Sequence, residues 1–165
     1  MGARLERLVL APAARRRRVL ATIRAARRRL VLSIFRCDDA RVLQALAGAA
    51  ARGVSVCAIV TPRARAGARR LDRMSGWLGV HGVEVRRGAS WTKYHAKYIV
   101  ADDRVALVTS LNFTSKCFTR TCDFLLVTSD PVVVSGLSAL FAADWASRPP
   151  EHSERHESRK RRRER

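Results

Sequence analysis

The sequence has few acidic residues, with 14 Asp and Glu against 33 Lys and Arg in 165 residues, and its formal net charge is +19. The final 15 residues hold seven basic and four acidic residues, so they contribute only +3 and the body of the chain is itself basic. Such a charge predicts a polyanionic partner, either a nucleic acid or an anionic membrane surface. The competing interpretation is that the arginine content reflects a compositional bias and that these side chains are merely solvated.

The sequence also lacks the usual marks of a metal site, a redox motif or a membrane anchor. Its four cysteines are Cys37, Cys57, Cys117 and Cys122. They form no C-x-x-C pair and no zinc-like grouping with histidines, so we expect no metal and no cofactor. No apolar run approaches the ~20 residues that cross a bilayer. Four arginines follow the apolar run of residues 8–14, the reverse of a secretory signal. These absences favour a cytoplasmic, reduced protein.

Hydrophobic spacing predicts one domain in which strands and helices alternate. Helices are expected at 14–29, 40–52, 71–79 and 131–145, and strands at 30–35, 54–61, 83–86, 94–102, 104–109 and 124–128. The first helix is basic and amphipathic, and Asp38-Asp39 and Gly53 supply a start and a stop for the second. This order predicts an α/β fold, a mixed β-sheet sandwiched by helices over residues 1–147. Residues 148–165 are expected to be a basic, disordered tail.

The segment from His95 to Asn112 carries most of the chemical information, and its spacing reads H-x-K-x4-D-x6-T-S-x-N. Period-two alternation over 94–102 predicts a strand that points His95 and Lys97 to the same side. Taken alone, such a histidine is more often a packing residue, and such a lysine is more often a solvated charge. Their spacing from the polar residues that follow favours a shared site.

A hairpin is expected to close that site. A turn at 102–103 reverses the chain, and the returning strand brings Ser110 and Asn112 back to the neighbourhood of His95. A phosphodiester is a sluggish anionic electrophile, so its catalyst needs a nucleophile that is uncharged near neutral pH and a fixed positive field. His95 and Lys97 would meet those needs, while Ser110 and Asn112 would add hydrogen bonds to the phosphate.

This motif resembles the signature of the phospholipase D superfamily of HKD-motif phosphodiesterases, with Thr109 where the family normally has glycine. A β-branched residue narrows the backbone at that point. The resemblance in element order covers residues 8–146, and the length and layout are similar to the small bacterial endonucleases of the family. It implies that His95 attacks phosphorus and forms a phosphohistidine while Lys97 neutralises the phosphoryl oxygens, without a metal.

The resemblance gives a catalytic set of His95, Lys97, Asp102 and Asp123. An unprotonated nucleophilic imidazole needs an acceptor on its other nitrogen, which selects its tautomer and orientation. Asp102 lies roughly five residues, or ~16 Å, along an extended chain from the lysine, so geometry favours a turn role for this member of the motif. A separate acid downstream commonly orients the histidine in the family, and Asp123 is assigned that part, although a strand-initial aspartate can also simply cap a turn.

The sequence holds one copy of the motif, whereas the phosphohistidine pathway of the family uses two imidazoles. The second is expected from another subunit of a two-fold homodimer that shares one active site. The favoured function is a metal-independent phosphodiesterase acting on nucleic acid. One alternative is a phospholipase D or a phosphatidyltransferase similar to cardiolipin synthase, with the basic helix on anionic headgroups of a phospholipid membrane. Another is an inactive half-domain that serves as a nucleic-acid-binding module.

Overall fold

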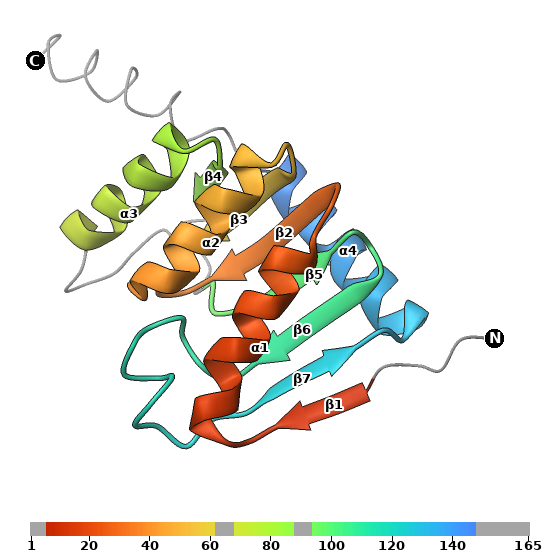
Figure 1. Cartoon of the computed structure of the whole chain (residues 1–165). Coiled ribbons are helices and arrows are strands. Elements are labelled where there is room, and N and C mark those ends of the chain that lie inside the picture. The colour runs from red at the N-terminus through yellow and green to blue at the C-terminus, as the bar shows by residue number, and fades with distance from the viewer. Residues whose placement is uncertain (1–5, 62–67, 88–93, 148–165) are drawn as a thin grey trace, which may run out of the picture.

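The computed structural model describes residues 6–61, 68–87 and 94–147. They form a seven-stranded mixed sheet with helices on both faces, which confirms the expected α/β sandwich (Figure 1). Residues 62–67 and 88–93, which lie between predicted elements, and the predicted tail at 148–165 are outside the described residues.

The element bounds agree with most of the predicted segments. The helices are α1 (Pro12–Ala25), α2 (Ala40–Ala51), α3 (Ala68–Val80) and α4 (Pro131–Ala146). The strands are β1 (Glu6–Val9), β2 (Arg29–Ile34), β3 (Ser55–Val60), β4 (Glu84–Arg87), β5 (Tyr98–Ala101), β6 (Val105–Thr109) and β7 (Leu125–Thr128). In the described part, none of the helices combines the length and hydrophobicity that a bilayer crossing requires.

The sheet joins a parallel half to an antiparallel half, in the order β1-β7-β6-β5-β2-β3-β4. Strands β2, β3 and β4 run parallel, with α2 and α3 as the connecting helices. Antiparallel pairing then continues from β2 through β5, β6 and β7 to β1. Strand β2 is therefore paired on both edges, with β3 on one side and the hairpin of β5 and β6 on the other.

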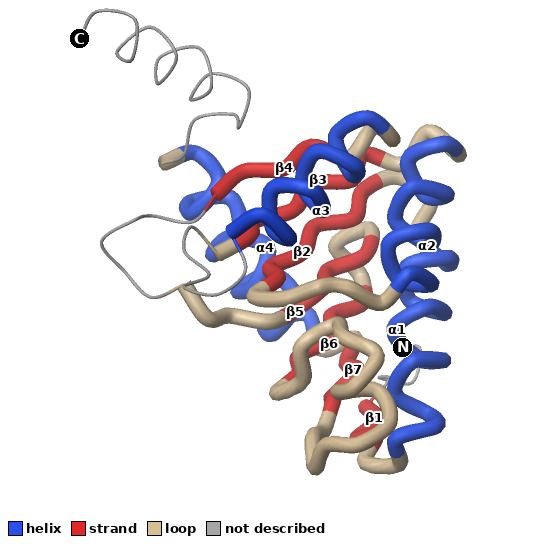
Figure 2. Tube along the Cα trace, turned by 90° about the vertical axis from the view of Figure 1, so that its left-hand side faces the viewer, coloured by secondary structure: helices blue, strands red, loops and turns tan. Residues whose placement is uncertain are grey.

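The two faces of the sheet are covered unequally. Helices α1 and α2 lie on one face and α4 lies on the other, as the side view shows (Figure 2). The larger core includes Ile23 of α1, Leu46 of α2 and Leu78 of α3, all of them fully buried. The smaller core packs Val134 and Phe141 of α4 against the opposite face of the central strands.

Local sequence signals explain where the helices begin and end. The Asp39 carboxylate accepts a hydrogen bond from the Val42 backbone N–H at 3.3 Å and caps α2, as predicted. Gly53 ends that helix with a φ of 84°, a conformation that glycine adopts without strain. Asp130 caps α4 by accepting from the Val132 N–H at 2.8 Å.

Two predicted segments have different bounds in the structure, and one strand was not predicted. The first helix ends at Ala25 rather than at residue 29, because Ala26 is extended and Arg29 already pairs with β3. The edge strand β1 is missing from the sequence prediction, since its four residues, including Glu6 and Arg7, show no clear alternation. Strand β5 begins only at Tyr98, so the two basic residues of the motif precede the strand instead of lying within it.

Candidate active site

The candidate site lies at the end of the sheet where β2 finishes and the hairpin of β5 and β6 opens. Lys97 immediately precedes β5, and Ser110 immediately follows β6. The Thr109 backbone N–H donates to the Lys97 carbonyl at 3.1 Å, and the Ser110 N–H donates to the Phe124 carbonyl at 3.2 Å. These bonds hold the lysine, the serine and the start of β7 side by side, as the spacing of the motif predicts.

His95 and Lys97 contact each other directly. The Lys97 ammonium Nζ lies 3.0 Å from the His95 carbonyl oxygen, 3.1 Å from its Nδ1 and 3.2 Å from its Nε2. His95 is exposed, whereas Lys97 is only 9% exposed. The Phe35 ring packs edge-on against the imidazole, with 4.6 Å between the ring centroids. The pair therefore presents an accessible ring beside a buried cation.

The electrostatics of this pair suit nucleophilic attack on an anion. Burial, followed by the positive charge of Lys97, lowers the pKa of His95 below its ordinary value of 6.5. Burial also lowers the pKa of Lys97 below 10.5, while negative charge at Asp123 and Cys117 opposes that shift. The imidazole is thus held unprotonated at neutral pH next to a fixed ammonium group.

Ser110 and Asp123 form a second polar group of the site. The Ser110 hydroxyl Oγ donates to Asp123 Oδ1 at 2.8 Å and accepts from the Phe124 backbone N–H at 3.1 Å. The other carboxylate oxygen accepts a short hydrogen bond from the Thr121 hydroxyl. The serine is exposed and the aspartate half-buried, so the serine oxygen is fixed in position yet accessible from solvent.

Thr109 stands where the family normally has glycine, and its hydroxyl is fully hydrogen-bonded. Its hydroxyl donates to the Phe124 carbonyl at 2.8 Å and accepts from the Leu111 backbone N–H at 3.2 Å. The side chain is buried. The threonine therefore ties the end of β6 to the chain that enters β7, and its β-branch points into this backbone contact.

Asn112 has one polar atom that lacks a partner. Its Oδ1 is buried and makes no hydrogen bond to any described residue. Its backbone carbonyl accepts from the Thr114 N–H at 2.8 Å, which fixes the start of the loop. This oxygen is a hydrogen-bond acceptor, so its unused capacity would suit a donor group and not a phosphate oxygen.

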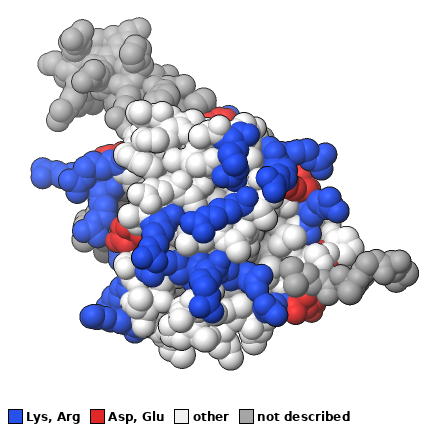
Figure 3. Space-filling model, viewed as in Figure 1, with Lys and Arg blue, Asp and Glu red and all other residues white. Residues whose placement is uncertain are grey.

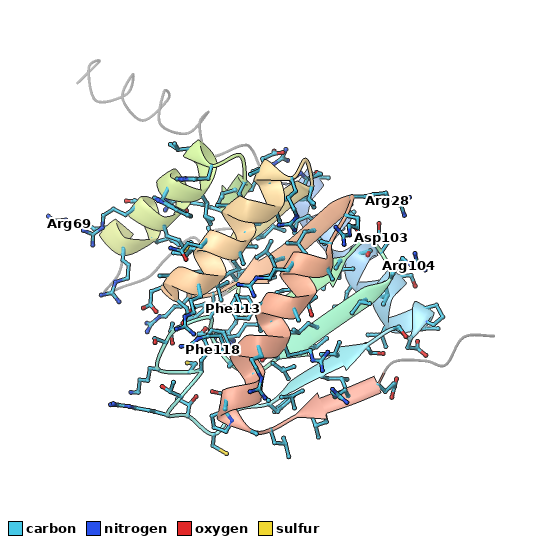
Figure 4. The ribbon with its side chains drawn as sticks, in the orientation of Figure 1. Arg28, Arg69, Asp103, Arg104, Phe113 and Phe118 are labelled. Atoms are coloured by element: carbon cyan, nitrogen blue, oxygen red, sulfur yellow. The ribbon has the colours of Figure 1, made fainter. Side chains whose placement is uncertain are left out.

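Asp102 lies outside the site, so its place in the catalytic set is corrected. Its carboxylate accepts from the backbone N–H groups of Arg27, Arg28 and Arg29 at 2.8–2.9 Å. Figure 4 shows its neighbour Asp103 beside Arg28, at the other end of the sheet from the site. Burial alone would raise the pKa of Asp102, but these amides outweigh it and hold the pKa below 3.8. Asp102 has the turn role that strand geometry predicts.

The expected hydrogen bond between Asp123 and the His95 ring is not made within the described residues. Both ring nitrogens of His95 face Lys97 instead, and both carboxylate oxygens of Asp123 are engaged by hydroxyl groups. Asp123 is nevertheless close enough to influence the pKa of Lys97. The structure therefore brings Asp123 to the serine and lysine, and the orienting role stays a prediction.

Two neighbours of the site have no counterpart in the motif. Phe35 directly follows β2, and the general tendency of α/β sheets to place sites at the carboxyl ends of parallel strands would have drawn attention to it. Thr121 bonds to Asp123 from a loop without regular structure, and no sequence pattern signals that contact. Among the described residues, no three His, Cys, Asp or Glu side chains gather as a metal site would require.

Comparisons with known proteins concern the family and the fold of the chain. Residues 19–145 match the family described as "Cardiolipin synthase, PLD-like domain". The crystal structure of Nuc from Salmonella typhimurium, a phospholipase D family member, superposes with a TM-score of 0.82 at 19% identity, covering 90% of this chain and 98% of that one. NucT from Helicobacter pylori superposes with a TM-score of 0.72 at 17% identity, covering 90% and 99%.

A curated relative matches over a shorter stretch. The mitochondrial cardiolipin hydrolase of Xenopus laevis is 35% identical over 75 residues, which are 46% of this chain. The match spans only 36% of the length of that relative. The structures of Nuc and NucT, at 19% and 17% identity, establish a shared fold.

Proposed function

Because this chain belongs to the phospholipase D-like domain family, we propose that it is a metal-independent phosphodiesterase whose nucleophile is His95. The contact of the Lys97 ammonium with the accessible His95 ring is the observation that carries the proposal. Ser110 directly follows β6, beside Lys97, and its hydroxyl is held by Asp123. Asn112 would contribute its amide Nδ2, which can donate to a phosphate oxygen.

The proposed reaction has two displacements at phosphorus. In the first, an imidazole nitrogen of His95 forms a bond to phosphorus, and the bond to the leaving oxygen breaks as that oxygen takes a proton from an acid. In the second, water attacks phosphorus and gives a proton back to the group that served as the acid, and the bond between phosphorus and His95 breaks. Lys97 stabilises the charge on the non-bridging oxygens in both steps, with hydrogen bonds from the Asn112 amide Nδ2 and from the Ser110 hydroxyl once its proton turns from Asp123 to the substrate.

We propose that the acid is the same histidine of a second copy of the chain, so that the enzyme is a homodimer. An apolar patch of Leu8, Leu10 and Phe124 supports this arrangement, since these side chains are 59%, 60% and 46% exposed. Phe124 directly follows Asp123, so the patch adjoins the site. A two-fold axis through this end of the sheet would bury the patch and bring two copies of His95 together.

Nucleic acid is the favoured substrate, because many basic side chains gather on one face of the protein. Figure 3 shows them spread over the face that α1 and α2 cover. The exposed arginines of these helices and of the turns that follow them are Arg17, Arg24, Arg27, Arg28, Arg41 and Arg52. None of the large exposed hydrophobic residues of the described part lies on α1 or α2. A basic face without apolar anchors suits a phosphate backbone better than insertion into a bilayer.

Phospholipid is the second candidate, and α4 is the observation in its favour. Its outer surface exposes Val132, Val133 and Leu140, at 76%, 38% and 47%. The curated relative that matches part of this chain is named a cardiolipin hydrolase, and the family description refers to cardiolipin synthase. An apolar helix surface could meet acyl chains while the site takes the headgroup diester.

A substrate panel in EDTA tests both candidates. The purified protein would be assayed with bis(p-nitrophenyl) phosphate, single-stranded DNA, RNA and cardiolipin vesicles. We expect cleavage of the generic diester and of a nucleic acid at undiminished rates in chelator. Cleavage restricted to the vesicles would favour the lipid enzyme. Activity that EDTA abolishes and Mg²⁺ or Zn²⁺ restores would contradict the metal-independent mechanism.

A further inference from the structure

Arg15 belongs to a run of four arginines in a basic helix, yet it is only 3% exposed. Arg17, two positions further on, is exposed. The arginines of this run therefore differ in burial, and Arg15 points from α1 into the protein.

The Arg15 guanidinium holds three backbone carbonyls. Its Nη1 donates to the Thr121 carbonyl at 2.7 Å and to the Cys117 carbonyl at 3.4 Å. Its Nη2 donates to the Leu10 carbonyl at 2.7 Å. No described carboxylate forms a salt bridge with it, and its Nε is buried without a partner. The buried cation thus joins the start of α1 to the loop between β6 and β7.

A short chain of hydrogen bonds leads from Arg15 to the site. The Thr121 carbonyl accepts a hydrogen bond from Arg15. The Thr121 hydroxyl contacts both Asp123 Oδ2 and the Cys117 carbonyl. One hydroxyl has one proton, and the charged carboxylate is the stronger acceptor. Asp123 Oδ1 accepts in turn from Ser110. The position of the guanidinium therefore fixes the carboxylate and the serine that border the phosphate site.

The next arginine secures the other side of the same loop. Arg16 pairs with Asp39 at 2.8 Å, donates to the Ser115 hydroxyl at 3.2 Å and lies 5.1 Å from the centre of the Phe118 ring. Figure 4 shows Phe118 beside Phe113 where this loop meets α1. The loop is therefore held from two directions by α1.

We propose that Arg15 is a positioning residue of the active site, which holds the 114–123 loop so that Asp123 and Ser110 face the substrate phosphate. This role rests on the proposed phosphodiesterase function. Loss of Arg15 would also cost stability, because three carbonyls would lose this donor, so the positioning role is tested by measurements on the folded protein. A buried cation bonded to carbonyls gives the loop a single position.

Lys97 supplies a readout that does not depend on turnover. Asp123, Cys117 and His95 are the charged and titratable groups that act on it. The negative charge of Asp123 raises the pKa of Lys97. If Arg15 no longer holds the loop and Asp123 moves away, the pKa of Lys97 falls further below 10.5.

The test compares Arg15→Met with the matched surface variant Arg73→Met on α3, both in the full chain. Three measurements are made on each: kcat and KM for bis(p-nitrophenyl) phosphate, the pKa of Lys97 by carbon NMR of its side chain, and hydrogen exchange of the loop amides. We expect Arg15→Met to lose about 10- to 100-fold in kcat, to lower the pKa of Lys97 and to speed exchange at 114–124. Arg73→Met should match wild type in all three, and Arg15→Lys should recover part of the loss.

Thr121→Val gives an independent arm should Arg15→Met fail to fold, because it removes only the hydroxyl that bonds to Asp123. It should also lower kcat and the pKa of Lys97. A folded Arg15→Met or Thr121→Val protein with the wild-type kcat and the wild-type pKa of Lys97 overturns this inference alone. Wild-type protein that fails to cleave the diester overturns the proposed function instead, and the exchange and NMR data still test the loop.

Discussion

At the residue scale, the chemistry of the site depends on the protonation states of two side chains two positions apart. Lys97 is buried and His95 is exposed, and the ammonium contacts both ring nitrogens. Mutual repulsion disfavours protonating the ring while the lysine is charged. Burial is the larger cause of the lowered pKa of His95, and the positive charge of Lys97 adds to it.

This repulsion predicts the acid side of the pH profile. The nucleophile is active when unprotonated, and its pKa lies below 6.5, so kcat/KM should fall on the acid side with an apparent pKa below 6.5. Lys97→Met removes the charge that lowers the pKa and should move the acid limb to higher pH as well as weaken substrate binding. The measurement is kcat/KM for bis(p-nitrophenyl) phosphate against pH. An acid limb of Lys97→Met at or below the wild-type position would contradict the coupling.

Asp102 gives a prediction about stability rather than catalysis. Asp102 has a φ of 55°, and it caps three consecutive backbone amides that lead into β2. Asp102→Ala removes the cap and places alanine in a left-handed conformation, so the free energy of unfolding should fall by about 2 kcal/mol. The kcat of the folded variant should stay close to wild type. Thermal unfolding checks the first part, and turnover below the unfolding temperature checks the second.

The pH dependence of that loss has a definite sign. The pKa of Asp102 is lowered in the folded protein, so its contribution is present above the unfolded value of 3.8 and is lost as the pH falls through the folded pKa. Wild type and Asp102→Ala should therefore approach each other in stability only in strong acid. A large loss of kcat in folded Asp102→Ala would return this residue to the catalytic set.

At the element scale, periodicity predicted most strands and helices, because the two faces of the sheet and the inner faces of α2 and α3 are apolar. It failed for β1, which is a four-residue edge strand with three exposed residues. It extended α1 too far, since the arginines that follow the helix are good helix formers. The pairing of Arg29 with Ser55 in the sheet decides where the chain becomes extended.

The site was predictable to the extent that it is local. The hairpin brings Lys97 and Ser110 together through adjacent strands, and a spacing rule captures that geometry. The contacts of Arg15 with Thr121 and Cys117 join residues more than 100 positions apart, and an arginine run on a helix looks the same whether it is buried or solvated. Tertiary packing buries Arg15 and leaves Arg17 exposed, and the spacing of the arginines does not encode this difference.

At the scale of the whole molecule, the apolar patch near the site and the basic face on α1 and α2 imply different partners. The patch of Leu8, Leu10 and Phe124 would be covered by a second copy, and the basic face would remain open to a polyanion. One copy of the motif can then complete a two-histidine site while each subunit keeps its own basic face.

Phe124→Asp tests the dimer. A carboxylate in the centre of the apolar patch should shift the protein to monomer and lower kcat by at least 10-fold, while the fold is retained because Phe124 is 46% exposed. Light scattering across protein concentrations measures the mass, and circular dichroism checks the fold. Leu140→Asp, on α4 and similarly exposed, is the matched control and should stay dimeric. A wild-type protein that is monomeric and fully active would refute the shared site.

The triple variant Arg17→Gln, Arg24→Gln and Arg28→Gln tests the basic face. Each phosphate contact contributes roughly 0.7 to the slope of log affinity against log salt for single strands, so the slope should flatten by about 2 and affinity for single-stranded DNA should fall. Turnover of bis(p-nitrophenyl) phosphate should not change, because the diester is too small to reach this face. Unchanged DNA binding would show that the partner does not use these arginines.

The central claim is that His95 forms a covalent bond to phosphorus. Wild type and His95→Asn would be mixed with a phosphorus-labelled diester, quenched without acid and digested for mass spectrometry. We predict label on the His95 peptide of wild type, stable to base and lost in acid, with no label in His95→Asn. Turnover of His95→Asn should be lower than wild type by several orders of magnitude, with substrate binding nearly unchanged. Turnover of His95→Asn at the wild-type rate would contradict the account.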